Sequence, residues 1–410
     1  MIKSKNLFLI FLYIILKVSS LENEKSLYKN SLRYLEDEYD NFIIIHFKED
    51  CNYSEGFINS YRTEINYLIN KENNIKLTGY DELIIHKNFG IEIHFNKAIT
   101  TFMKFFDIFE DKNMEYLLSV DLSNFNSSLI TSAEFLFYGC SSLELIDFSN
   151  FDTKLITNMG GMFYYCSSLK SIDLSNFETS SVVSMLFMFL GCKSLTSIDI
   201  TNFDISSVTE IGAMFAECSS LNSIDLSNFN TQSVISMDSI FYGCNSLISI
   251  DLSPLKTILL TNMNYMFSGC SSLKSIALSN VDTSLVTNMA YIFYGCTSLE
   301  SIDLSTLNTF KVQSMTNMFC NCTSLKVINI LNLNTSNVND MNSMFSGCSS
   351  LQSINLAKFD TSLVTNMKNM FKKCSSLNSI DISNFKTSKV TSMEEMFYEC
   401  KSLKNINIPN

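Results

Sequence analysis

The chain has 410 residues, of which 46% are hydrophobic, 17% charged and 12% aromatic, and its formal net charge is -12. With 33 Phe and 20 Met, this composition is typical of a folded protein and excludes a disordered chain. The negative balance argues against a surface that follows nucleic-acid phosphates, so we expect no nucleic-acid partner.

Residues 1–20 have the organisation of a secretory signal peptide. Lys3 precedes an unbroken apolar run from Leu7 to Leu16, and Ser19 and Ser20 supply small residues for cleavage. The run is shorter than the roughly 20 apolar residues that a membrane span needs. We therefore expect an exported chain without a membrane span, and an uncleaved anchor is the alternative.

Residues 21–113 lack the period described below and predict a small α+β region that caps the core. Apolar runs predict strands over 41–48, 82–86 and 90–95, whereas 57–70 is compatible with a helix. A degenerate first repeat followed by a short insertion is indicated by the spacing of Ile99, Phe102, Phe105 and Phe106.

The three His of the chain, His46, His86 and His94, all lie in this N-terminal region, on predicted strands. They would be zinc ligands if the fold gathered them on adjacent strands. Each lies in an apolar strand without a closely spaced ligand pair, so we favour a structural role.

A 26-residue repeat occupies residues 114–410, as 11 full units and a partial one. The frame begins at Met114, which takes the place of the repeating Cys. That Cys recurs at Cys140, Cys166, Cys192, Cys218, Cys244, Cys270, Cys296, Cys322, Cys348, Cys374 and Cys400.

Each unit has two apolar patterns of different period. Leu169, Ile172 and Leu174 have the spacing of a short strand with one buried face. The second pattern contains Val182, Met185, Met188, Phe189 and Cys192, which follow one another at steps of three, three, one and three residues. This spacing predicts one face of a short helix. The units therefore predict an α/β solenoid of leucine-rich-repeat type, with strand–helix units and a parallel β-sheet on one face.

The repeat Cys-Ser-Ser-Leu-x-Ser-Ile-Asp-Leu-Ser-Asn-Phe-x-Thr-Ser-x-Val-x-x-Met-x-x-Met-Phe resembles that of BspA-like leucine-rich-repeat surface proteins. The resemblance implies an extracellular or cell-surface protein that takes part in adhesion or in binding a host or partner, without catalysis.

The repeating Cys predict a column of buried free thiols. Equivalent residues of stacked units lie about 4.8 Å apart with parallel side chains, whereas a disulfide needs Cβ atoms about 3.8 Å apart that face each other. Bridges between neighbours and metal binding are the alternatives. Cys320, which is extra to the column, and Cys322 are the most plausible exception, and Cys51 is a candidate unpaired thiol.

The outward strand positions form a nearly uniform Ser-Asp-Ser row. Its acidic column contains Asp121, Asp147, Asp173, Asp199, Asp225 and Asp251. Mutual repulsion is expected to raise some of their pKa values or to recruit calcium. An ordinary solvated acidic row is the favoured alternative, because calcium cages need converging oxygen ligands.

One interruption of this row is a candidate contact patch, where Val327, Asn329 and Leu331 replace Ser, Asp and Ser. Four sequons fit export by a eukaryotic route and are glycosylation candidates, at Asn52, Asn126, Asn321 and Asn334.

No pattern of catalytic or cofactor-binding residues is present. The repeat array has no His, which excludes a Ser-His-Asp or Cys-His arrangement there, and no phosphate-binding Gly-rich loop or HExxH occurs. We therefore expect a non-enzyme without cofactor.

The favoured interpretation is a secreted or cell-surface protein that binds an extracellular protein or glycan through the strand face. A self-associating coat or matrix component is the alternative, and an enzyme in 21–113 is a distant third. The chain ends at Asn410 without a polar cap, which indicates self-association or a truncated gene.

Overall fold

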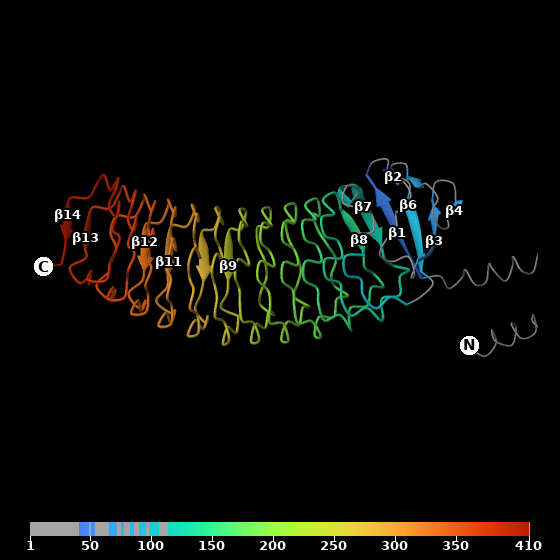
Figure 1. Cartoon of the computed structure of the whole chain (residues 1–410), viewed down its shortest axis with the longest axis horizontal. Coiled ribbons are helices and arrows are strands. Elements are labelled where there is room, and N and C mark those ends of the chain that lie inside the picture. Colours follow the sequence, from blue (N-terminus) through green and yellow to red (C-terminus); the bar gives the residue numbers. More distant parts are fainter. Residues whose placement is uncertain are drawn as a thin grey trace, which may run out of the picture.

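The computed structural model describes residues 41–48, 51–53, 65–71, 75–77, 83–85, 90–95, 98–105 and 114–409. The predicted signal peptide lies outside these residues. The described chain winds into a long, gently curved row of coils, with a β-sheet near its first residues and β14 at the opposite end (Figure 1).

The N-terminal region forms an antiparallel sheet that continues into the first coils. Its strands are β1 (Asn41–Phe47), β3 (Ile65–Asn70), β4 (Ile75–Leu77) and β6 (Gly90–Phe95), followed by β7 (Leu117–Asp121) and β8 (Leu145–Asp147) in the order β4-β3-β6-β1-β7-β8. A separate ribbon pairs β2 (Cys51–Tyr53) with β5 (Leu83–Ile85). A short 3-10 helix over Met114–Tyr116 precedes β7.

The change from antiparallel cap to parallel solenoid occurs at β7. It pairs antiparallel with β1 on one side and parallel with β8 on the other, so β1 covers the edge of the first coil. The strands expected over 41–48 and 90–95 are confirmed, and β5 lies within 82–86. The helix expected over 57–70 is wrong for Ile65–Asn70, which pairs with both β4 and β6, and 57–64 lie outside the described residues.

A degenerate first coil precedes the regular array. Ile99, Phe102 and Phe105 are buried in the core, while Phe106 lies outside the described residues. The Thr131 amide donates to the Thr100 carbonyl 31 residues earlier, whereas the spacing between later coils is 26. The insertion therefore falls between the first two coils.

One long side of each coil, which we call the strand wall, carries short parallel strands. Beyond β8 these are β9 (Ser249–Asp251), β10 (Ser275–Ala277), β11 (Ser301–Asp303), β12 (Val327–Asn329), β13 (Ser379–Asp381) and β14 (Asn405–Asn407). They pair in register, so that the Ile of one coil lies beside the Ile of the next, and these Ile side chains are buried or half-buried except Ile406 of the last coil, which is 44% exposed. The residues on either side of each Ile, mostly Ser and Asp, point outward. This half of the unit is as predicted.

The other long side, which we call the turn wall, contains no α-helix in the described coils, so the predicted strand–helix unit is wrong. The amides of Gly161, Phe163 and Tyr165 donate to carbonyls in the next coil, whereas those of Met162 and Tyr164 close turns onto residues three positions back. Gly161 and Tyr165 have positive φ, each 59°, which an α-helix does not tolerate.

Hydrogen bonding to the next coil satisfies backbone groups that a helix would satisfy internally. One parallel bridge joins each pair of successive coils on this wall, from Thr101 through Ser132 to Ser392. The apolar spacing attributed to a helix still marks the inward side chains, because Val182, Met185, Met188, Phe189 and Cys192 are all buried. The prediction that these side chains are buried is therefore confirmed, although the predicted helical backbone is wrong.

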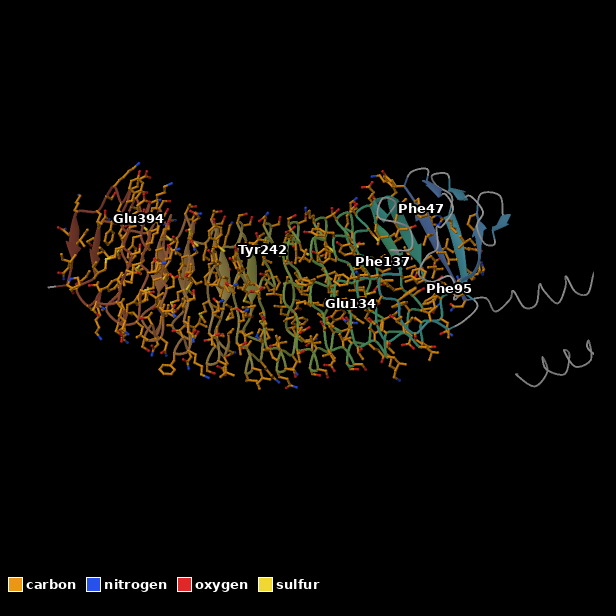
Figure 2. All side chains as sticks on the ribbon, viewed as in Figure 1. Phe47, Phe95, Glu134, Phe137, Tyr242 and Glu394 are labelled. Atoms are coloured by element: carbon orange, nitrogen blue, oxygen red, sulfur yellow. The ribbon has the colours of Figure 1, made fainter. Side chains whose placement is uncertain are left out.

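A column of stacked Phe rings runs through the core between the two walls. Phe137, labelled in Figure 2, begins the column and Phe397 ends it. Neighbouring ring centroids are 5.2–5.9 Å apart, and the ring planes are within 17° of parallel. Leu, Ile, Val and Met columns surround it as one continuous cluster. Each coil therefore buries its apolar side chains mainly against its neighbours.

Candidate functional site

The repeating Cys are structural. The described thiols are all free. Each repeating Cys from Cys166 to Cys400, but not the extra Cys320, donates to a carbonyl 29 residues earlier, as Cys166 does to Phe137 at 3.2 Å. Burial raises the pKa of the Cys270 thiol to about 12, so the column is un-ionised and unreactive. The free-thiol prediction is confirmed for these residues, and the suspected Cys320–Cys322 exception is wrong, since both are buried and unbridged.

The Asp column of the strand wall caps the turns that follow the strands. In each unit an Asp Oδ1 accepts from the amide two residues later: Ser123 to Asp121 at 2.8 Å, Ser149 to Asp147 at 2.8 Å, Ser175 to Asp173 at 2.9 Å, Thr201 to Asp199 at 3.0 Å, Ser227 to Asp225 at 2.8 Å and Ser253 to Asp251 at 2.8 Å. One oxygen of each carboxylate is therefore committed to its own backbone.

The expected rise in pKa is wrong for Asp173, Asp199, Asp225 and Asp251, whose pKa values are lowered. Hydrogen bonds from the Ser175 hydroxyl and amide lower the pKa of Asp173, and the Thr201 hydroxyl and amide do the same for Asp199. Repulsion between neighbours does appear, since Asp199 opposes the lowering at Asp225, but it is the smallest effect there. Donors that favour the charged form outweigh the like charge one coil away.

Among the described residues, no three or more His, Cys, Asp or Glu side chains lie close enough to hold a metal ion. The Asp side chains stand side by side along one column instead of converging. Calcium binding by this column stays a prediction, to be tested by titration.

The structure separates the two described His. His94 lies opposite Phe42 on the strand pair β1–β6, whereas His46 lies opposite Gly90 four residues along. His94 Nε2 lies 3.2 Å from Glu92 Oε2 and its ring contacts Phe42, while burial lowers the pKa of His46. These contacts favour structural roles, and His86 lies outside the described residues.

The apolar interruption predicted from the sequence lies on the outer surface of the strand wall. Val327 is 63% and Leu331 41% exposed, and β12 places Val327 beside Ser301 and Asn329 beside Asp303. Two branched apolar side chains therefore stand where the neighbouring coil presents Ser.

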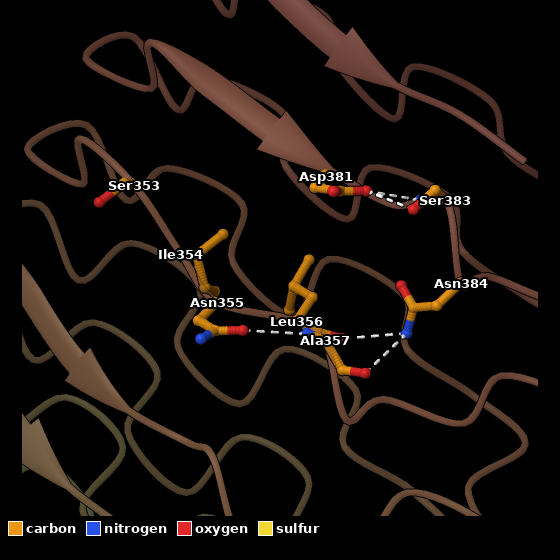
Figure 3. A pocket seen from close by; sticks show the side chains of 8 residues that line it. All are labelled: Ser353, Ile354, Asn355, Leu356, Ala357, Asp381, Ser383 and Asn384. Carbon is orange, nitrogen blue, oxygen red and sulfur yellow. Dashed lines mark hydrogen bonds between the residues drawn. The ribbon is translucent and has the colours of Figure 1, made fainter.

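A hollow of about 450 Å³ opens on the strand wall one and two coils further along. Its rim is formed by Ser353, Ile354, Asn355, Leu356, Ala357, Asp381, Ser383 and Asn384 (Figure 3). Asn384 Nδ2 donates to the Leu356 and Phe359 carbonyls, at 3.1 and 3.0 Å, and holds the two coils together below the hollow. Ala357 follows Leu331 at the same repeat position, so the apolar patch and the hollow adjoin.

Sequence reasoning missed Leu145, which also occupies a Ser position of the outward row and is 65% exposed on β8. It stands alone, since the next coils carry Ser171 and Ser197 there. The patch at Val327 differs because a hollow adjoins it.

The described sequons lie at exposed turns. Asn126 and Asn334 each accept a hydrogen bond from the hydroxyl of their own sequon Ser, at 2.7 Å in both cases, and Asn321 is exposed with a φ of 62°. The Asn52 side chain lies outside the described part of the structure.

Within the described residues no helix is long and apolar enough to span a membrane. The stacked 26-residue coils, the parallel strand wall and the continuous core define a repeat protein with a leucine-rich-repeat-like β-solenoid.

The chain belongs to the family described as "Mycoplasma protein of unknown function, DUF285". The family profile matches residues 103–222, 131–251, 170–277, 248–328 and 324–410.

Two solved structures are similar to this chain at low identity. A leucine-rich repeat protein from Eubacterium ventriosum ATCC 27560 has 16% identity and a TM-score of 0.37, with 79% of this chain and 95% of that one covered. A TLR13–ssRNA13 complex has 15% identity and a TM-score of 0.23, with 66% of this chain and 47% of that one covered. A comparison with curated proteins finds no match.

Proposed function

We propose that this protein is a secreted or cell-surface binding scaffold, comparable to BspA-like surface proteins, without catalytic activity. Its ligand is an extracellular protein or glycan. The strand wall is the binding face, and the site lies where the patch of Val327, Asn329 and Leu331 adjoins the hollow at Ser353–Asn384.

The observation that carries this proposal is the apolar break in the Ser-Asp-Ser row beside a hollow. Six coils present Ser-Asp-Ser and a seventh presents Ser-Asp-Thr, and one oxygen of each of these Asp side chains accepts from a backbone amide. The site instead combines exposed apolar carbon at Val327 and Leu331 with amide, hydroxyl and carboxylate groups at Asn355, Asp381 and Ser383. Apolar contacts with a few polar groups around a concavity are typical of ligand sites.

The test restores the repeat. A Val327→Ser/Asn329→Asp/Leu331→Ser variant has the residues that the preceding coil carries at Ser301, Asp303 and Ser305, so it is expected to fold normally. Wild-type protein and variant are applied to glycan and extracellular-protein arrays, and the variant is expected to lose the wild-type signals. Leu145→Ser, which restores the same row in a distant coil, is the matched control. Equal signals from all three proteins would contradict a site at the Val327 patch.

Export is tested separately by expression in eukaryotic cells. Secretion of a chain cleaved after residue 20 and sensitive to glycosidase supports the signal peptide and the sequons. An intracellular, unmodified chain contradicts both.

The second candidate is a self-associating coat or matrix component. Light-scattering mass over a concentration series, with and without calcium, distinguishes the two. Assembly with concentration favours the coat, and assembly only with calcium also assigns a role to the Asp column.

A further inference from the structure

The turn wall, not the strand wall, carries the aromatic surface of the solenoid. Side chains that point away from the core form one cluster at Phe135, Tyr138, Tyr164, Tyr165 and Phe187, and a second at Tyr242, Tyr265, Tyr291 and Tyr294. Tyr138 is 44% and Tyr242 40% exposed, and the others are half-buried. Tyr242 and Glu134 of this wall are marked in Figure 2.

The rings are held in place by their neighbours. Tyr138 stacks on Tyr164 at 5.2 Å, and Tyr164 meets Tyr165 edge to face at 4.7 Å. In the second cluster Tyr265 stacks on Tyr291 at 4.4 Å. Aromatic platforms fixed before binding lose little conformational entropy when a ligand docks, and Tyr is enriched at binding hot spots.

The same wall is acidic. Over its eight segments between Ser132 and Cys322 it carries Glu134, Glu210, Glu217 and Asp238 and has no Lys or Arg. None of these four carboxylates forms a salt bridge with another described residue. Burial is the main cause that raises the pKa of Tyr164, and the Glu217 carboxylate adds to the rise.

Rings on this wall accept cations within the chain itself. Lys104 Nζ lies 5.8 Å from the ring centre of Phe135, and Lys372 Nζ lies 5.4 Å from that of Tyr398. Tyr398 occupies the same repeat position as Tyr138, Tyr164 and Tyr242, and Lys372 occupies that position one coil earlier. Lys372 therefore shows how a cation fits over a ring in this column.

We propose that the turn wall between Ser132 and Cys296 is a second docking surface, for a Lys- or Arg-rich segment of a partner protein. Ring faces and carboxylates without a salt bridge are complementary to ammonium and guanidinium groups. Lys104, over Phe135 at one edge of the surface, is the cation of the described chain that lies on these rings, and the turn-wall segments between Ser132 and Cys296 contain no Lys or Arg. This surface is independent of the proposed site at Val327.

A second copy of the chain fits less well as the occupant. Its Lys-rich coils lie at 366–404, but Lys368 pairs with Glu394 at 2.6 Å and Lys372 with Glu395. The charges of these two Lys side chains are therefore already compensated within the chain.

The test uses the full chain and a fluorescein-labelled peptide of alternating Arg and Gly, followed by fluorescence anisotropy. We expect binding that weakens as salt increases, and no binding of the matching Glu-Gly peptide. In a Tyr138→Ser/Tyr164→Ser variant the Kd is expected to rise about tenfold, the effect of losing two exposed cation–π contacts. Ser occupies this repeat position at Ser268 and Ser346, so the fold tolerates it.

Two further variants sharpen the result. Glu217→Gly, which introduces the residue found at Gly191 and Gly243, is expected to weaken binding as well. Tyr398→Ser is the matched control and is expected to leave the Kd unchanged, because Lys372 already covers that ring.

Failure of the peptide to bind, an unchanged Kd in the Tyr138→Ser/Tyr164→Ser variant, or binding insensitive to salt would overturn the proposal. A concentration-dependent dimer abolished by the same two substitutions would identify a second copy as the occupant and likewise overturn it. The Val327 variant is expected to bind the peptide normally, so failure here is distinguishable from failure of the strand-wall proposal.

Discussion

A column of buried Thr hydroxyls gives the sharpest test of how neighbouring coils are joined. Thr309 Oγ1 donates to the Asn334 carbonyl at 2.9 Å and accepts from the Asn334 amide at 2.7 Å, 25 residues later. Thr231 occupies the equivalent position, and its buried hydroxyl has no hydrogen-bond partner. The same Thr→Val substitution therefore removes two hydrogen bonds at one position and none at the other.

The expected magnitudes follow from this difference. Thr309→Val removes the partner of the part-buried Asn334 amide and carbonyl. Because these groups are only partly buried, the cost is near the lower end of the usual range, about 1–1.5 kcal/mol for each group, and the added apolar carbon returns roughly 1 kcal/mol. We expect a net loss of about 1–2 kcal/mol. Thr231→Val replaces an unpaired buried hydroxyl by a methyl group and is expected to be neutral or to stabilise by up to about 1 kcal/mol.

The assay is urea denaturation with a shared m-value, combined with hydrogen exchange read by mass spectrometry. Exchange is needed because long repeat arrays can unfold in parts. Thr309→Val should lower the urea midpoint and speed exchange of the Asn334 amide, whereas Thr231→Val should do neither. Equal midpoint shifts for both variants would refute the reasoning, because burial alone would then determine the cost.

Three further predictions use the same repeat equivalence. Lys373 has a φ of 61° where Gly269 has 80°, so Lys373→Gly is expected to stabilise by about 0.5–1 kcal/mol and Gly269→Ala to destabilise by about 1 kcal/mol, measured as midpoint shifts. Burial raises the pKa of the Cys270 thiol to about 12, so in a pulse of iodoacetamide at pH 7 this thiol should react about a thousandfold slower in the folded protein than in urea. Among the described thiols the half-buried Cys400 should react first. Labelling of all thiols at the same rate would contradict the buried thiol column. The folded pKa values of Asp173, Asp199, Asp225 and Asp251 are lowered, so the stabilisation from these carboxylates is present above the unfolded pKa of about 3.9 and is lost as pH falls through the folded value. The melting temperature should therefore drop below about pH 4, and Asp→Asn variants at these positions, which retain the oxygen acceptor, should show a flatter decline.

The inward columns could be predicted because burial leaves a direct trace in the sequence. Leu169, Ile172 and Leu174 mark one face of the strand wall, and Met185 and Phe189 mark the inner side of the turn wall, whatever backbone joins them. The spacing of apolar residues indicates which side chains face the core, but it does not indicate which carbonyl accepts a hydrogen bond from each backbone amide. The register, the period and the stacked core followed from the sequence for this reason.

The backbone conformation of the turn wall could not be predicted from the sequence. One of its two left-handed positions, the one that would have argued against a helix, is seldom occupied by glycine. Gly191 and Gly243 precede the repeating Cys, where a glycine also suits the end of a helix. The left-handed position four residues earlier is filled by Phe187 and Ser239, which gave no signal against a helix. Only the backbone bonds to the next coil, which need both coils in place, reveal the extended path.

The role of the Asp column was accessible and was misjudged. Asp followed two residues later by Ser or Thr is the pattern of a side chain that accepts from its own backbone. The expectation of raised pKa values counted only the negative charges along the column. It overlooked hydrogen-bond donors such as Ser175 and Thr201, which bond directly to the carboxylates of Asp173 and Asp199.

Hydrogen bonding between coils also explains where this repeat is free to vary. Residues whose side chains bond to a neighbouring coil, such as Thr309 and Asn384, cannot change without leaving groups unsatisfied in that coil. Positions whose side chains form no hydrogen bond to a neighbouring coil carry no such penalty, and there the chain replaces Ser by Val327 and places Tyr138 where another coil has Ser268. The hydrogen-bonded columns maintain one geometry, and departures at the unbonded positions give different parts of the surface different chemistry. The two proposed docking surfaces both consist of such departures, and the core separates them, so we expect substitutions in one to leave binding at the other unchanged.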